Sequence, residues 1–104
     1  MTIQLNADNN LKINKDYAKK LNAIIDDSFK RYSEYLTRIE VHFSDENSHK
    51  TSSNDKKCVL EAKLKGREPI AVSDFGDTYD LAFDSAIDKM KASLDTILGK
   101  MLNK

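Results

Sequence analysis

Four basic residues in the middle of the chain have types and spacing that could bind phosphate groups. Lys57, Lys63 and Lys65 occupy odd-numbered positions, which share one face of an extended strand, and Arg67 follows closely. Lysine and arginine on such a face can contact the phosphates of a nucleic acid without reading its bases. The alternative is an ordinary solvated sheet face, and the spacing alone leaves both interpretations open.

Groups that could support catalysis or hold a metal are sparse. His42, His49 and Cys58 lack the closely spaced pairs that a tetrahedral zinc site needs. Asp84 and Asp88 stand one helical turn apart, a spacing that could serve Mg²⁺ binding or acid–base chemistry but is more typical of a solvated helix face. The three glycines cannot build a phosphate-binding loop. We therefore predict no enzyme, no metal, no cofactor and no small-molecule substrate.

The charge is balanced in total but not along the chain. The 17 basic and 17 acidic residues give zero net charge, so the chain as a whole has no electrostatic attraction to nucleic acid. Residues 56–67 hold five basic residues against one acidic residue, whereas residues 68–88 hold six acidic residues and no basic one. The acidic stretch indicates a second class of function, a protein–protein module that binds a basic partner.

The composition predicts one soluble α+β domain over residues 1–104. Apolar residues make up 39% of the chain, charged residues 33%, and the mean hydropathy is -0.61. The start lacks the pattern of a signal peptide, and no segment approaches the ~20 apolar residues that span a membrane. Because Cys58 is the only cysteine, no internal disulfide can form, and we expect a cytoplasmic protein that does not bind membranes.

Hydrophobic periodicity predicts the elements that position these side chains. Alternating apolar residues predict strands at 2–7, 36–44, 58–64 and 69–73, with a turn at 65–68 before the last strand. Apolar stripes at helical spacing predict a helix from the cap Asn14 through Tyr32, and another from Asp77 or Thr78 onward, whose last turn Gly99 could fray.

The predicted order is β-α-β-β-β-α, and two amphipathic helices need a common apolar surface. We therefore predict a four-stranded sheet with both helices packed on one face and the opposite face open to solvent. Cys58 should lie on the buried side of the sheet and His42 on the open side. The open face is predicted to carry Arg38, Glu40, His42, Lys57, Glu61, Lys63 and Lys65.

Three segments resemble one protein family at matching positions along nearly the whole chain. They are the first strand with its continuation into Leu11-Lys12 and a helix, the strand Thr37-Arg38-Ile39-Glu40-Val41-His42-Phe43, and Ala82-Phe83-Asp84-Ser85-Ala86-Ile87-Asp88-Lys89-Met90. The last segment is similar to the motif A-I-D-x-(A/L)-I-D-K-L. This is the family of ribosome hibernation-promoting factors, also called ribosome-associated inhibitors or sigma-54 modulation proteins, and the chain resembles a divergent short branch of it.

The resemblance implies a bacterial translation inhibitor that occupies the decoding groove of the small ribosomal subunit and contacts ribosomal RNA phosphates. It also implies two contact residues on the last helix, since Lys89 matches the lysine of the motif and Lys91 falls in the basic stretch after it. The predicted RNA-binding residues are therefore Lys57, Lys63, Lys65, Arg67, Lys89 and Lys91. The oligomeric state stays open.

Two features depart from the family pattern. Asp80 stands where better-known members have a tyrosine, and with Asp84, Asp88 and Asp95 it makes the last helix less basic than theirs. The chain also ends at Lys104, without the extension through which the long form of the family dimerises ribosomes. We therefore expect that this chain alone does not pair ribosomes.

Overall fold

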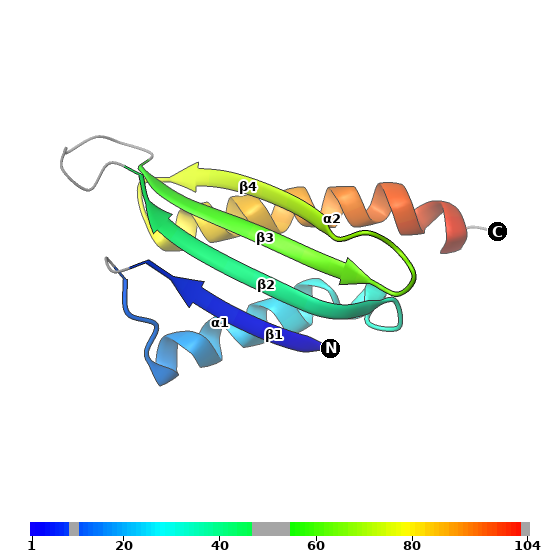
Figure 1. Cartoon of the computed structure of the whole chain (residues 1–104), viewed down its shortest axis with the longest axis horizontal. Coiled ribbons are helices and arrows are strands. Elements are labelled where there is room, and N and C mark those ends of the chain that lie inside the picture. The colour runs from blue at the N-terminus through cyan, green and yellow to red at the C-terminus, as the bar shows by residue number, and fades with distance from the viewer. Residues whose placement is uncertain (9–10, 47–54, 103–104) are drawn as a thin grey trace.

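Four strands form one sheet, in the order β1-β2-β3-β4, with two helices on one of its faces (Figure 1). The computed structural model describes residues 1–8, 11–46 and 55–102, with side chains described as far as Gly99. This arrangement confirms the predicted β-α-β-β-β-α order. The elements are β1 Thr2–Ala7, α1 Lys15–Ser28, a 3-10 helix Lys30–Tyr32, β2 Leu36–Asp45, β3 Lys56–Leu64, β4 Ile70–Gly76 and α2 Tyr79–Leu102.

The strand register places most apolar residues of the four strands on one face, whereas Val59, Ala71 and Phe75 lie on the other. β1 runs parallel to β2 because α1 returns the chain across the sheet, and Leu5 pairs with Val41. β2 pairs antiparallel with β3, and β3 with β4, so that Val41 lies beside Leu60 and Leu60 beside Val72. Both helices cover this apolar face, and the other face has no layer packed on it in the described part of the chain (Figure 1).

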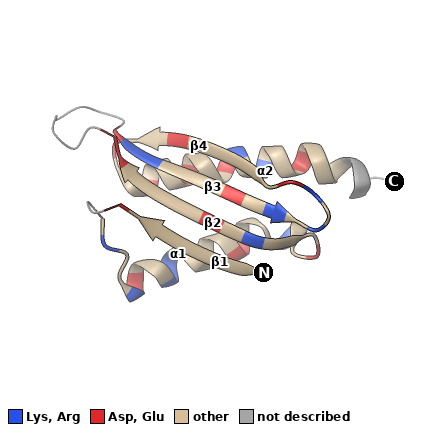
Figure 2. Cartoon of the chain, viewed as in Figure 1, with Lys and Arg blue, Asp and Glu red and all other residues tan. Residues whose placement is uncertain are grey.

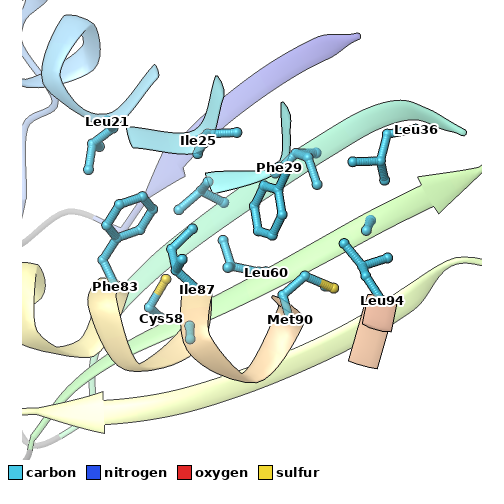
Figure 3. Close-up of a cluster of buried hydrophobic side chains, with 14 of the residues drawn as sticks. Leu21, Ile25, Phe29, Leu36, Cys58, Leu60, Phe83, Ile87, Met90 and Leu94 are labelled. Atoms are coloured by element: carbon cyan, nitrogen blue, oxygen red, sulfur yellow. The ribbon is translucent and has the colours of Figure 1, made fainter. Parts of the chain in front are cut away.

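The core lies between the sheet and the two helices. α1 contributes Leu21 and Ile25, and α2 contributes Phe83, Met90 and Leu94, all fully buried (Figure 3). Cys58 of β3 is also buried, which confirms its predicted place, and burial raises the pKa of its thiol to about 12. A thiol with such a pKa stays protonated near neutral pH, so Cys58 is a packing residue rather than a nucleophile.

The first helix is shorter than predicted. Asn14 caps it as expected, because its side-chain Oδ1 accepts a hydrogen bond from the Tyr17 backbone N–H at 2.8 Å. The helix ends at Ser28 rather than continuing to Tyr32, and the chain tightens into the 3-10 helix, where the Tyr32 N–H donates to the Phe29 carbonyl. The tighter turn still buries both aromatic rings, which is why their spacing looked helical.

Replacing Asn14 by alanine is expected to lower the free energy of unfolding by about 1 kcal/mol, because the cap hydrogen bond is removed at an exposed helix start. Urea denaturation checks this value. Asn14→Asp is the matched control, since aspartate restores an acceptor at the same position and should recover most of the stability. Equal stability of the alanine variant and the parent would contradict this role for the cap.

The ends of β4 and α2 also differ from the prediction. β4 continues past Ser73 to Gly76 because β3 begins at Lys56, and the pair Lys56–Gly76 extends the ladder. A Cβ atom at Gly76 would lie 2.7 Å from the Ala82 backbone nitrogen, so only glycine allows this close approach to α2. Thr78 is the cap, with its Oγ1 accepting from the Leu81 N–H, and α2 runs through Gly99 without ending there.

Candidate nucleic-acid interface

The open face of the sheet carries bands of opposite charge. Figure 2 shows basic residues towards both ends of β3 with an acidic residue between them. Arg38, towards the β3–β4 turn, reaches the two acidic residues in the middle of the face: its Nε lies 3.2 Å from Glu40 and its Nη2 lies 3.8 Å from Glu61. The predicted open side is confirmed, with His42 exposed, and the charge of Arg38 is neutralised by Glu40 and Glu61.

Three of the predicted RNA-binding residues come together at the turn between β3 and β4. Lys63 is the last residue of β3 on the open face. Its Nζ donates to the backbone carbonyl oxygen of Leu64 at 3.2 Å and to that of Arg67. Lys65 was predicted on the strand face, but β3 ends at Leu64, and Lys65 lies exposed in the turn with Arg67. Gly66, with φ of 71°, lets the chain reverse there.

The fold adds three cations that the sequence pattern did not group with this turn. Arg38 of β2 pairs across the ladder with Lys63. The Lys65 backbone N–H donates to the Tyr35 carbonyl at 2.9 Å, which brings the 3-10 helix and its Lys30 and Arg31 to the same end of the sheet (Figure 1). We call this region the basic end; it comprises Lys30, Arg31, Arg38, Lys63, Lys65 and Arg67.

The other three predicted residues lie elsewhere. Lys57 is six residues before Lys63 on β3, about 20 Å away at the rise of a strand. Lys89 reaches the edge of β4, where its Nζ donates to the Ser73 carbonyl at 3.0 Å. Lys91 follows Lys89 by two residues, which corresponds to a rotation of about 200° around the helix axis. The two lysines of α2 therefore point to nearly opposite sides of the helix.

The cations differ in how far they are neutralised. Arg31 pairs with Asp95, Lys57 with Glu46 and Lys89 with Asp74, at 3.4–3.5 Å. Within residues 1–8, 11–46 and 55–99, the side chains of Lys30, Lys65 and Lys91 form no ion pair. These three ammonium groups can therefore bind a phosphate without first breaking an ion pair with a carboxylate.

Residues 9–101 match the family model described as Sigma 54 modulation protein / S30EA ribosomal protein. The chain belongs to this family. The resemblance found in the sequence is thereby confirmed over nearly the whole chain. None of the curated proteins matches it.

Two solved structures similar to this family member support the same fold. The N-terminal domain of Thermus thermophilus Protein Y has a TM-score of 0.73 and 16% identity, with 93% of this chain and 99% of that one covered. A ribosomal subunit interface protein from Coxiella burnetii has a TM-score of 0.71 and 16% identity, with 95% and 99% covered. At this identity the likeness concerns the fold alone.

The acidic residues of α2 differ in whether they hold a partner. Asp80 Oδ2 lies 2.9 Å from Lys20 Nζ, and its Oδ1 accepts from the Tyr17 hydroxyl at 2.8 Å. The hydrogen bond from Lys20, and then that from Tyr17, hold the pKa of Asp80 below its usual value. Asp84 and Asp88 are exposed and form no ion pair with any described side chain.

Metal binding and membrane spanning were also considered as roles for the described residues. The described residues include no group of three or more His, Cys, Asp or Glu side chains placed to hold a metal ion, and His49 lies outside them. Within the same residues, no helix is both long and apolar enough to cross a bilayer.

Proposed function

We propose that this chain is a ribosome-associated translation inhibitor that binds the decoding groove of the small subunit through ribosomal RNA backbone contacts. The observation that carries the proposal is the family match over residues 9–101. Occupation of that groove would exclude messenger and transfer RNA, so the chain would act by binding rather than by catalysis. Its place of action would be the bacterial cytoplasm.

The basic end supports phosphate contact in this role. It combines cations from the 3-10 helix, β2, β3 and the β3–β4 turn at one end of the sheet, and Lys30 and Lys65 there lack an ion pair among the described residues. Lysine and arginine contacts to backbone phosphates carry affinity without base readout, which suits a binder of folded RNA. Lys57, Lys89 and Lys91 would make separate contacts, since they lie away from the basic end.

A second candidate function rests on the exposed acidic side of α2. Asp84 and Asp88 stand one turn apart, and within the described part of the chain neither is paired with a cation. A basic protein could be the partner of such a surface, with electrostatic complementarity setting the association rate. The fold would then be used as a protein–protein module.

Co-sedimentation separates the two functions. If the chain binds ribosomal RNA, it should migrate with 30S or 70S particles in a sucrose gradient and be released progressively as the salt concentration rises. A chain that remains at the top of the gradient at every salt concentration would rule out the ribosomal role. Capture of basic proteins that persists after nuclease treatment would favour the protein–protein module.

A further inference from the structure

Two carboxylates of α2 hold two cations from the first helical segment. Lys20 of α1 lies 2.9 Å from Asp80, and Arg31 of the 3-10 helix lies 3.5 Å from Asp95. The four side chains are 50–61% exposed, so the pairs lie at the surface and not in the core. Each cation therefore lies where a phosphate in solution could reach it.

The packing of the helices places both ion pairs between α2 and the first helical segment. α1 and α2 lie on the same face of the sheet and begin at the same end of it (Figure 1). Asp80 and Asp95 are 15 residues apart in α2, which is about 22 Å along the axis and a rotation of about 60°. They therefore share one side of α2, and contacts to Lys20 and Arg31 show that this side faces the first helical segment.

We propose that Asp80 and Asp95 act as internal substitutes for nucleic-acid phosphates and so set a lower affinity of this chain for RNA. A carboxylate oxygen occupies the same donors that a phosphate oxygen would use, so Lys20 and Arg31 bind RNA only by exchanging one anion for another. Exposed ion pairs of this kind are weak, and the exchange therefore lowers the affinity without preventing binding. For the ribosome as ligand, the inference rests on the proposed function.

The same helix offers a matched control. Asp84 and Asp88 are exposed but hold no cation among the described residues. The double variants D80N/D95N and D84N/D88N remove the same charge from the same helix, but only the first releases Lys20 and Arg31. Asparagine also keeps an oxygen that can accept from the Tyr17 hydroxyl, which limits the structural change at position 80.

The test compares the variants on immobilised heparin, a polyanion, and with purified 30S subunits. D80N/D95N should elute from heparin at higher salt than D84N/D88N. Its binding to 30S subunits should show a salt slope steeper by up to about two units, one for each released cation.

Thermal melting shows whether each variant is folded. The single variant D95N, which releases Arg31 from a pair that is more than half exposed, should give about half of the effect and is not expected to alter folding.

The outcomes separate this inference from the proposed function. Equal shifts on heparin for the two double variants, or no shift for D80N/D95N and D95N, would overturn the inference, because net charge alone would then explain the affinity. A larger heparin shift for D80N/D95N with no binding of any variant to 30S subunits would uphold it while refuting the ribosomal role.

Discussion

Replacement of Phe43 by alanine is expected to lower the free energy of unfolding by about 3–5 kcal/mol. Phe43 is 2% exposed and projects from β2 into the space beneath both helices. Its ring lies 6.3 Å from that of Tyr17 in α1, and 5.5 and 6.1 Å from those of Tyr79 and Phe83 in α2. Truncation of this ring removes a side chain of the sheet that contacts aromatic rings of both helices.

Urea denaturation followed by circular dichroism measures this change in stability. Phe43→Leu is the matched control, because leucine keeps most of the apolar volume and should cost less than the alanine variant. A cost below about 1 kcal/mol for Phe43→Ala would show that the site collapses around the cavity, and that the ring cluster is not needed to hold the helices.

The double replacement Lys63→Ala/Lys65→Ala is expected to weaken ribosome binding about tenfold, because each of two exposed charge contacts contributes ~1 kcal/mol or less. The salt slope of binding should fall by about two units, one for each phosphate that no longer meets a lysine. Lys65 has no ion pair among the described residues, whereas Lys63 donates to the carbonyls of the β3–β4 turn. The single variant Lys65→Ala therefore tests phosphate contact without loosening the turn.

Lys12→Ala/Lys15→Ala is the control for net charge, since both lysines are exposed and unpaired among the described residues, at the start of α1. Equal weakening by both double variants would indicate an effect of total charge only. If affinity and salt slope are unchanged after Lys63 and Lys65 are replaced, these two lysines belong to a solvated surface that does not contact RNA. The contacts would then be sought in the first helical segment, at Lys19, Lys20, Lys30 and Arg31, and also at Lys12 and Lys15 if their replacement alone weakens binding.

Element order and the faces of the strands could be predicted because they depend on local periodicity. The alternation that puts Cys58 inside and His42 outside is a property of any strand, and the structure confirms both places. The ends of elements were predicted less well. The extension of β4 to Gly76 depends on pairing with Lys56 of another strand, and Asp-Phe-Gly by itself is typical of a turn.

The surface that could meet RNA was only partly visible in the sequence. Lys63, Lys65 and Arg67 are neighbours in the chain, and their grouping at one turn follows from that closeness. Arg38 and Arg31 join them only because β2 pairs with β3 and because the Tyr35 carbonyl accepts from Lys65. Conversely, Lys89 and Lys91 are close in sequence but are separated by the rotation of a helix.

Local patterns in the chain were enough to predict the order of strands and helices, the apolar face that each presents, and the membership of the family. Which charges remain available depends instead on the packing of the helices. Asp80 neutralises Lys20 across 60 residues of chain, and Arg31 meets Asp95 far along α2, because the two helices pack on one sheet face. A charge pattern in the sequence gives only the separation of residues along the chain, whereas the strength of an ion pair depends on the distance between the charges in space. Only the folded structure therefore shows which cations already have a carboxylate partner.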